Sequence, residues 1–204
     1  MNTNLWNRWR YTLYAPIYDR IVRSFNTSRQ RSIELLALKA GERVLLIGAG
    51  TGEDLQFIPE GVKITAVDIT PAMVEQICRK AKFLNRPVEA AVMDGQALEL
   101  PSESFDAVVL HLILAVIPDP IACIQESARV LKPGGRVVVF DKFLPEKEQP
   151  SLQRRLANLV ANFAFSDINR KLESIAAAAP LTLLHEEPAV YGRFGYKIAL
   201  YEKP

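Results

Sequence analysis

Three glycines at alternate positions follow a short apolar run, and they form the first pattern in the chain that could do chemistry. Residues 44–47 are VLLI, and the glycine loop that follows, residues 48–52, is GAGTG. Glycine lets the backbone turn tightly and lets a ligand approach with no Cβ in the way. Because doubly wound folds bind ligands at the carboxyl ends of strands, this loop predicts a ligand-binding turn.

Two acidic residues fall at the ends of the next two strand-like runs. Asp68 lies twenty residues after Gly48, where a carboxylate can accept hydrogen bonds from both hydroxyls of a ribose. Asp94 can accept a hydrogen bond from an adenine amine, although alone it would be an ordinary carboxylate in a turn. Together with the glycine loop, these acids predict a site for a nucleoside-containing cofactor.

The spacing of the glycines separates two such cofactors. Dinucleotide sites carry G-x-G-x-x-G and place a pyrophosphate at the N-terminus of a helix. Here the pattern is G-x-G-x-G, followed by Glu53 and Asp54. We expect a helix to begin after this loop. Two carboxylates at its N-terminus would repel a pyrophosphate but tolerate the ammonium and sulfonium groups of S-adenosylmethionine. We therefore expect S-adenosylmethionine, with a nicotinamide cofactor as the rival.

Short β-branched runs alternate with helical stretches from residue 43 onward, which predicts βαβ units and a parallel sheet. Most are apolar throughout, as strands covered on both faces should be: residues 43–47, 63–68, 88–93, 105–110 and 135–141. Thr70-Pro71 and Asp119-Pro120 each give an N-cap followed by proline at the first helical position. The first of these helices should end near residue 84 and the second at residues 132–135.

The last part of the chain continues with helices and closes with strands. Apolar residues share one helical face in residues 151–165, and a further helix is expected over residues 167–178. Residues 181–186 and 196–202 are strand-like and flank a turn region rich in proline and glycine. They predict an antiparallel hairpin at the sheet edge.

Composition bounds the class of protein. The 204 residues have room for one core, and 49% hydrophobic with 24% charged residues is typical of a soluble globular protein. The net charge of +2 predicts no nucleic-acid partner, although residues 1–40 hold seven basic and two acidic side chains, net +5. Cys78 and Cys123 are too far apart for a redox pair or a metal site, so no metal is expected. With neither a membrane-span pattern nor a signal-peptide pattern, we expect a cytoplasmic protein.

Five segments resemble successive motifs of the class I S-adenosylmethionine-dependent methyltransferases, in the same order: residues 44–54, 66–73 (AVDITPAM), 93–96 (MDGQ), 105–108 (FDAV) and 131–135 (LKPGG). The resemblance implies an α/β fold with a Rossmann-like doubly wound, mostly parallel seven-stranded sheet, a C-terminal antiparallel hairpin and an N-terminal helical lid. It divides the chain into that lid, residues 1–40, and a methyltransferase domain, residues 41–204.

The resemblance also implies a set of cofactor contacts. Matched position by position, these are the loop around the methionine moiety, the ribose acid with two apolar neighbours, and the adenine contacts: Gly48, Ala49, Gly50, Asp68, Ile69, Met73, Asp94, Gly95 and Gln96. The family also places an N-terminal helix over the cofactor, with the tyrosine of a Tyr-Asp pair near the methionyl carboxylate. That tyrosine is Tyr18 here.

Within this class, the chain resembles the short bacterial phospholipid N-methyltransferases and, more distantly, the ubiquinone and menaquinone C-methyltransferases. The similarity lies in residues 14–19 (YAPIYD) and 114–120 (LAVIPDP). It implies N-methylation of the ethanolamine headgroup of phospholipids. The alternatives are C-, O- or S-methylation of a small molecule or quinone-like lipid, and a non-catalytic S-adenosylmethionine-binding module.

Residues 4–14 give the lipid substrate independent support. On a helix, apolar side chains fall within one arc and polar ones point elsewhere: Leu5, Trp6, Trp9 and Leu13 against Asn4, Asn7, Arg8 and Arg10. Such a helix suits an anionic membrane surface and would make the protein peripheral on the inner face of the membrane. Alternatively, it covers the active site with its tryptophans packed inward.

Few residues qualify for a role beside the acceptor. Tyr14 and Tyr18 could hydrogen-bond a substrate or contact an ammonium through cation–π attraction, or they are ordinary core aromatics. His111 follows the fourth strand and, like Tyr18, could take a proton from an amine as a general base; a histidine packed in a loop is the alternative. Methyl transfer itself is an in-line displacement that requires alignment and exclusion of water, with no nucleophilic residue.

Overall fold

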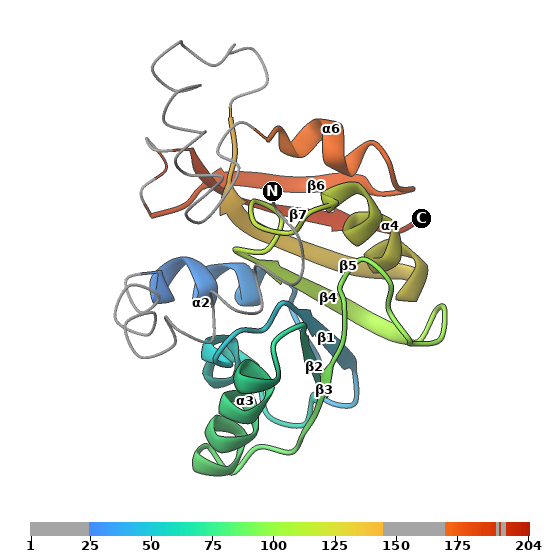
Figure 1. The fold of residues 1–204 in the computed structure, drawn as a ribbon. Coiled ribbons are helices and arrows are strands. Elements are labelled where there is room, and N and C mark those ends of the chain that lie inside the picture. The colour runs from blue at the N-terminus through green and yellow to red at the C-terminus, as the bar shows by residue number, and fades with distance from the viewer. Residues whose placement is uncertain (1–24, 145–169, 191, 193–194) are drawn as a thin grey trace.

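The computed structural model describes residues 25–144, 170–190, 192 and 195–204, in which strands and helices alternate along most of the chain (Figure 1). The elements in chain order are α2 (Asn26–Leu35), β1 (Arg43–Ile47), the short 3-10 helix η1 (Glu53–Phe57), β2 (Lys63–Asp68), α3 (Pro71–Phe83), β3 (Val88–Val92), β4 (Phe105–His111), α4 (Pro120–Val130), β5 (Leu131–Lys142), α6 (Leu172–Ala176), β6 (Thr182–Pro188) and β7 (Tyr196–Glu202).

Seven strands form one sheet in the order β3-β2-β1-β4-β5-β7-β6. Strands β1 to β5 pair in parallel with one another, and β7 is antiparallel to both β5 and β6. From β1 the chain first moves outward to β3 and then crosses to β4 on the other side of β1. This reversal creates a switch point, where a crevice opens beyond the carboxyl ends of the strands. The predicted doubly wound sheet with a C-terminal antiparallel hairpin is confirmed.

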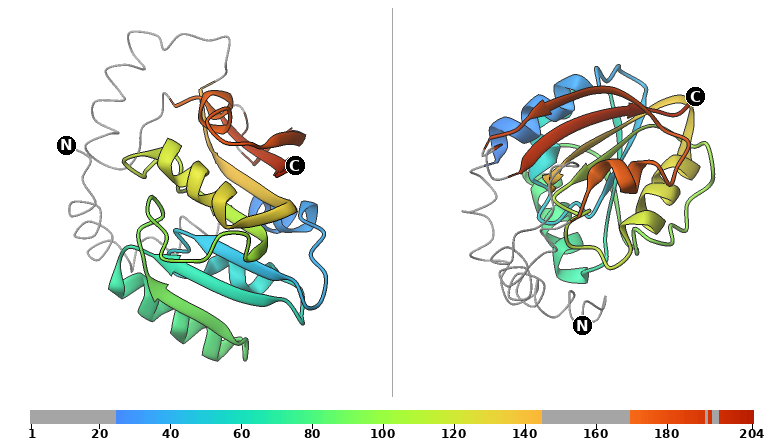
Figure 2. Two further views of the ribbon diagram at one scale, coloured as in Figure 1. Left: turned by 90° about the vertical axis from the view of Figure 1, so that its right-hand side faces the viewer. Right: turned by 90° about the horizontal axis from the view of Figure 1, so that it is seen from above.

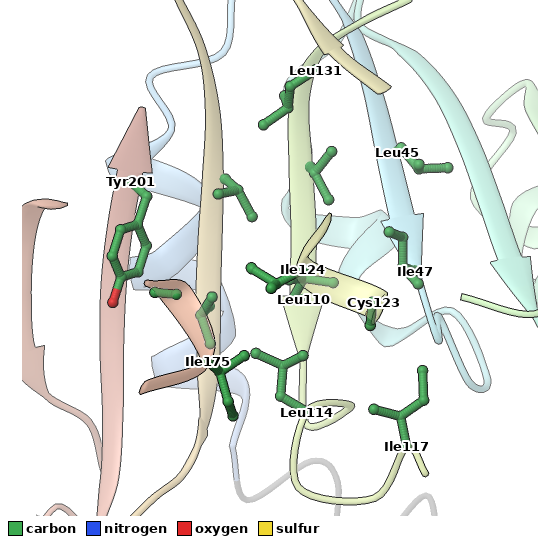
Figure 3. Packing of buried hydrophobic residues seen from close by; sticks show 14 of the residues in the cluster. Leu45, Ile47, Leu110, Leu114, Ile117, Cys123, Ile124, Leu131, Ile175 and Tyr201 are labelled. Atoms are coloured by element: carbon green, nitrogen blue, oxygen red, sulfur yellow. The ribbon is translucent and has the colours of Figure 1, made fainter. Parts of the chain in front are cut away.

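Helices cover both faces of the sheet, as the two views of Figure 2 show. Successive side chains of a strand point to opposite faces, so Leu46 belongs to the apolar layer that includes residues of α2, η1 and α3, whereas Leu45 belongs to the layer that includes residues of α4 and α6. Figure 3 shows the second of these layers, with Ile124 of α4 and Ile175 of α6 over the middle strands. Each such side chain stabilises the fold by about 1.5–3 kcal/mol on burial. This two-sided burial explains why the strand sequences are apolar almost throughout.

The glycine loop leads into a shorter helix than the sequence suggested. Instead of an α-helix, only the five residues of η1 follow it. Ile58 is extended, with φ −74° and ψ 130°, and Pro59 comes next. Because proline pushes the residue before it out of the helical region, this Ile-Pro pair ends the helix.

Strand β5 starts earlier than expected, at Leu131 rather than at residue 135. Leu131 pairs with Phe105, and the register then shifts before Ala107 pairs with Arg136. The Lys-Pro-Gly-Gly stretch is therefore an irregularity inside the strand, and α4 ends before it at Val130. Of the other expected helices, α6 covers only residues 172–176 of 167–178, while residues 4–14, 151–165 and 167–169 lie outside the described residues.

The two Pro-containing helix starts differ in chemistry. Asp119 caps α4, because its Oδ1 accepts hydrogen bonds of 3.0 Å from the backbone N–H groups of Ile121 and Ala122. Thr70 occupies the same position before α3 but makes no capping hydrogen bond with its side chain. No helix in the described ranges is long and apolar enough to span a membrane.

Replacing Asp119 with alanine removes both hydrogen bonds to the first turn of α4. We expect this change to lower the free energy of unfolding by about 1 kcal/mol. Asp119→Asn keeps a side-chain oxygen in place and is the matched control, with a loss of less than about half as much. Urea unfolding followed by circular dichroism measures both variants, and equal losses would contradict the capping role.

Candidate functional site

A pocket of about 800 Å³, open mouth included, lies at the carboxyl ends of the central strands. Eight of the predicted cofactor residues line it: Gly48, Ala49, Gly50, Asp68, Ile69, Met73, Asp94 and Gly95. The rest of the wall comes mainly from α2, from the segment after the glycine loop and from residues 112–118, which we call the β4–α4 loop. The fold thus brings the glycine loop and both acidic residues to one place.

Two glycines keep the pocket open by their lack of a side chain. Gly48 has a left-handed backbone with φ +65°, and a Cβ there would lie 2.6 Å from Cδ1 of Ile113. A Cβ on Gly95 would lie 2.6 Å from Cγ2 of Ile47. A Cβ at either position would crowd the side chain of Ile113 or Ile47, and the left-handed backbone of Gly48 also favours glycine.

Asp68 lies at the end of β2 and braces the glycine loop. Its Oδ2 accepts a hydrogen bond from the backbone N–H of Gly50 at 3.0 Å, and its Oδ1 accepts one from Thr70 at 2.9 Å. Burial raises the pKa of the Asp68 carboxyl, although these two N–H groups act in the opposite direction. A carboxylate that faces the pocket beside neutral donors can accept further hydrogen bonds from a ligand hydroxyl.

Asp94 and Gln96 are bonded to each other, and only Asp94 lines the pocket. The Gln96 side-chain Nε2 donates to Asp94 Oδ1 at 2.9 Å, and its Oε1 accepts from the backbone N–H of Asp119 at 2.7 Å. Gln96 therefore ties Asp94 to the start of α4. Gln96 does not line the pocket, and its direct contact with the cofactor stays a prediction.

A buried charge network joins α2, η1 and β4 beside the pocket. Asp54 accepts hydrogen bonds from Nη1 of Arg29 at 2.8 and 2.9 Å, and its Oδ1 lies 2.8 Å from Nδ1 of His111. Nε2 of His111 lies 2.6 Å from Oγ of Ser32. All four residues are buried. Burial alone would raise the pKa of the Asp54 carboxyl, but Arg29 and His111 hold it well below its usual range.

The predicted role of His111 as a general base would require it to give up one of its partners in this network. His111 lines the pocket, and both of its ring nitrogens are engaged, one with Asp54 and one with Ser32. The order Ser-His-Asp matches a nucleophilic triad, yet Ser32 is fully buried and its hydroxyl also lies 2.8 Å from the Arg29 carbonyl oxygen. The three residues therefore serve to dock α2 on β4.

The two acids after the glycine loop do not act as the sequence suggested. Asp54 is committed to Arg29 and His111, and Glu53, although it lines the pocket, is paired with Lys80 of α3. Protein cations thus neutralise both carboxylates, which weakens the argument that they repel a pyrophosphate. The charges that remain beside the pocket belong to Asp68 and Asp94.

Two residues of the wall were missed by sequence reasoning. Arg29 brings a guanidinium to the pocket from α2, and nothing in its local sequence distinguishes it from neighbouring Arg31. Thr51 is buried against the pocket, and its hydroxyl has no hydrogen-bond partner within the described residues. Tyr14 and Tyr18, the tyrosines predicted beside the acceptor, lie outside the described residues. Among the described residues, no group of histidine, cysteine, aspartate and glutamate could hold a metal ion.

Comparison with known proteins identifies the family. Residues 45–139 match the family described as a methyltransferase domain. The chain is 33% identical over 133 residues to a phosphatidylethanolamine N-methyltransferase from Cereibacter sphaeroides. The aligned region covers 64% of this chain and 66% of the relative. It is 34% identical to a demethylmenaquinone methyltransferase from Tropheryma whipplei, with coverage of 69% and 60%. The chain therefore carries the domain of the class I S-adenosylmethionine-dependent methyltransferases.

A solved geranyl diphosphate methyltransferase in complex with S-adenosylmethionine has the same fold as this methyltransferase. The TM-score is 0.75 at 16% identity, and the match covers 88% of this chain and 85% of the other. At such identity the likeness shows the fold alone. The methyltransferase spans less than two thirds of the length of either sequence relative, 66% and 60%.

The pocket of the methyltransferase fits S-adenosylmethionine, the cofactor of its family. Gly48 and Gly95, which we call the glycine cradle, let a ligand come close to the backbone. Asp68 and Asp94 offer acceptors for hydroxyl and amine donors. Thr51 and Arg29 offer donors for a carboxylate on the same wall. A nucleoside joined to an amino acid carries both kinds of group.

Replacing Asp68 with alanine removes the acceptor at the end of β2. We expect the Kd for S-adenosylhomocysteine to rise at least about 100-fold, because bonds to a charged acceptor contribute about 1.5–3 kcal/mol each. Isothermal titration calorimetry measures the change. The control is Glu89→Ala, because Glu89 lies near the amino end of β3 and does not line the pocket. This variant should keep the affinity of the original chain. An Asp68→Ala variant with unchanged affinity would mean that the acceptor role is misplaced.

Asp54→Asn should expose the role of the buried network in stability. Because the pKa of Asp54 is lower in the folded than in the unfolded chain, its stabilising effect is complete above the unfolded pKa of about 4 and declines as the pH falls below it. We expect the variant to lose about 3 kcal/mol of unfolding free energy at pH 7 and less at pH 3.

Urea unfolding at the two pH values measures this difference. The control is Glu75→Gln, since Glu75 forms an exposed ion pair with Arg79 one turn away on α3. That substitution should cost less than about 0.5 kcal/mol at either pH. A loss for Asp54→Asn that is the same at both pH values would contradict the charge pairing.

Proposed function

We propose that this methyltransferase transfers a methyl group from S-adenosylmethionine to the amine of the ethanolamine headgroup of phospholipids, at a membrane surface. The observation that carries the proposal is that the described pocket wall offers hydrogen-bond acceptors and apolar side chains but no uncommitted base. The similarity to a phosphatidylethanolamine N-methyltransferase names a substrate that fits such a wall.

The chemistry makes an amine the better acceptor for this wall. S-adenosylmethionine supplies a methyl carbon that is already activated by a positive sulfur, so the chain has to align the acceptor and exclude water. Leu112, Ile113 and Val116 form an apolar surface suited to that exclusion. An amine becomes nucleophilic as soon as it loses its proton to water, whereas a quinol carbon requires a general base that ionises the neighbouring hydroxyl. The engagement of both nitrogens of His111 therefore favours the amine.

Each part of the cofactor has a counterpart on the wall in this proposal. Asp68 binds the ribose hydroxyls and Asp94 the adenine amine. Arg29 and Thr51 receive the carboxylate of the methionine moiety, where the guanidinium pairs with it as a fixed charge. Tyr18, from the Tyr-Asp pair of the sequence, contacts the same end, and Tyr14 lies toward the acceptor.

The membrane part of the proposal rests on residues 4–14. Two tryptophans and two leucines share one helical arc there, with arginines beside it. Aromatic and apolar side chains bury in the interface of the bilayer while arginines attract anionic lipids. The same residues would act as a lid if they packed on the protein, so the two roles have to be separated by experiment.

Vesicles that contain phosphatidylethanolamine and an anionic lipid test the proposal directly. With radiolabelled S-adenosylmethionine, we expect label in phosphatidylethanolamine and none in vesicles of phosphatidylcholine and anionic lipid alone. Replacing Trp6 and Trp9 with alanine should reduce vesicle binding at least about fivefold, since each loses a large interfacial surface. The same variant should bind S-adenosylhomocysteine as well as the original chain.

Replacement of Asn4 and Asn7, on the other side of the predicted helix, is the matched control and should leave vesicle binding intact. Absence of label in phosphatidylethanolamine would overturn the proposed substrate, and label in a demethylated quinol would establish the alternative. Binding of S-adenosylhomocysteine without transfer to any acceptor would indicate a non-catalytic binding module. A tryptophan variant that binds vesicles normally but loses affinity for S-adenosylhomocysteine would assign residues 4–14 to a lid.

A further inference from the structure

The β4–α4 loop sets the width of the cofactor pocket. Its side chains lie against both glycines that keep the pocket open: a Cβ on Gly48 would meet Ile113 at 2.6 Å, and one on Gly95 would lie 3.4 Å from Ile117. Leu112, at the start of the loop, has a left-handed backbone with φ +57°, which is uncommon for a residue with a branched side chain. A loop that begins in such a conformation requires contacts that hold it there.

The backbone N–H of Leu112 donates to the carbonyl oxygen of Phe140 at 2.8 Å. Two charged residues, Asp141 and Arg170, hold the rest of the loop. Oδ2 of Asp141, at the end of β5, accepts a hydrogen bond of 2.9 Å from the backbone N–H of Ala115. The guanidinium of Arg170 donates to three carbonyl oxygens of the loop: to Leu114, to Ile117 at 2.6 Å and to Pro118 at 3.3 Å. Two side chains thus bind four backbone groups of one short loop.

Arg170 is itself fixed to the strand that carries Asp141. The backbone N–H of Leu144 donates to the Arg170 carbonyl oxygen at 2.8 Å, just beyond the end of β5. A guanidinium presents five N–H donors in a rigid plane, so it can bind several carbonyl groups without adjusting its shape. Hydrogen bonds from a charged donor are also stronger than neutral ones. The loop is therefore attached to β5 by charge-assisted bonds in addition to apolar packing.

We propose that Asp141 and Arg170 are positioning residues of this methyltransferase, which hold the β4–α4 loop against the glycine cradle and so maintain the cofactor pocket. They do not line the pocket themselves and act through Ile113 and Ile117. The proposal concerns the cofactor half of the site and is independent of the acceptor. Its test can therefore fail while the proposed phospholipid substrate is confirmed, and it can succeed while that substrate is refuted.

The charge of Asp141 gives the proposal a second measurable consequence. Burial raises the pKa of the Asp141 carboxyl to about 6, although the charge of Arg170 and the N–H groups around it lower it. The titratable groups that interact with it are Arg170 and the Tyr196 hydroxyl of β7, and the loop contributes backbone N–H groups. As the pH falls through about 6, the carboxyl takes up a proton and loses its attraction for Arg170. The pocket should then lose affinity for the cofactor.

Arg170→Met tests the positioning role, with S-adenosylhomocysteine as the probe in calorimetry. We expect the Kd to rise at least about tenfold, and Arg170→Lys, which keeps a cation that can reach part of the loop, to recover most of the affinity. Arg136→Met is the matched control. Like Arg170, Arg136 donates to a backbone carbonyl, that of Leu36. It lies in β5, nearer to the end of the strand that is opposite Asp141. Its loss should change stability and leave the Kd unaltered.

Asp141→Asn is tested by the pH dependence of affinity for S-adenosylhomocysteine, which would not change if Asp141 had only a structural role. The original chain should bind S-adenosylhomocysteine more weakly at pH 5.5 than at pH 7.5, by at least about threefold, whereas the variant should bind weakly at both. A folded Arg170→Met variant with unchanged Kd would overturn the proposal. If that variant does not fold, the Asp141→Asn profile decides: a pH dependence equal to that of the original chain refutes the positioning role, and a flat profile supports it.

Discussion

The bonds between a buried carboxylate, Asp54, and its two partners, Arg29 and His111, are the interactions on which the pocket depends. A carboxylate in the interior is stable only when charge and hydrogen bonds compensate its loss of water. Arg29 from α2 and His111 from β4 supply both, and Ser32 completes the hydrogen bonding of the histidine. Removing one partner leaves a buried charge and costs about 3–5 kcal/mol, so α2 cannot separate from the sheet without that penalty. Helix α2 is therefore part of the pocket wall and not an independent cover.

Four aspartates near the carboxyl edge of the sheet acquire different roles from their partners. Asp54 pairs with cations, Asp68 holds the backbone of the glycine loop, Asp94 is supported by Gln96, and Asp141 holds the β4–α4 loop. The residue type is the same in each case, and all four lie close to strand ends. The pocket keeps two of them on its wall because Asp54 and Asp141 are directed into the protein. Asp68 and Asp94 can thus contact a ligand, whereas Asp54 and Asp141 hold the walls of the cavity.

The sequence predicted the strands and the cofactor loops because those signals are local. β1, β2 and β7 begin and end where the apolar runs do, and the glycine loop and Asp68 are adjacent to the strands that place them. The Ile58-Pro59 pair was a local signal too, and it would have shortened the helix after the glycine loop. By contrast, Arg29 meets Asp54 across 25 residues, Arg170 meets Ile117 across 53, and Ser32 meets His111 across 79. Such pairings depend on the order of strands in the folded sheet, so periodicity and spacing could not assign them. For the same reason the sequence could place His111 at the crevice but could not show its two partners.

The physical demands of methyl transfer explain why the cofactor half of the pocket is better defined by sequence than the acceptor half. The sheet fixes Asp68, Asp94 and the glycine loop, and any acceptor that reaches the activated methyl group with the right alignment can use the same frame. We propose that acceptor choice belongs to parts of the wall that do not hold the cofactor, in particular to the apolar side chains of Leu112 and Val116 in the β4–α4 loop. The wall is held by charged side chains on both sides, Asp54 for α2 and Asp141 with Arg170 for the loop. Substitutions of apolar residues such as Leu112 or Val116 should therefore reshape the acceptor side while the anchors and Ile113 keep the cofactor in place. Selection for a new acceptor should act on those apolar residues first, because a change in an anchor would disturb both halves at once.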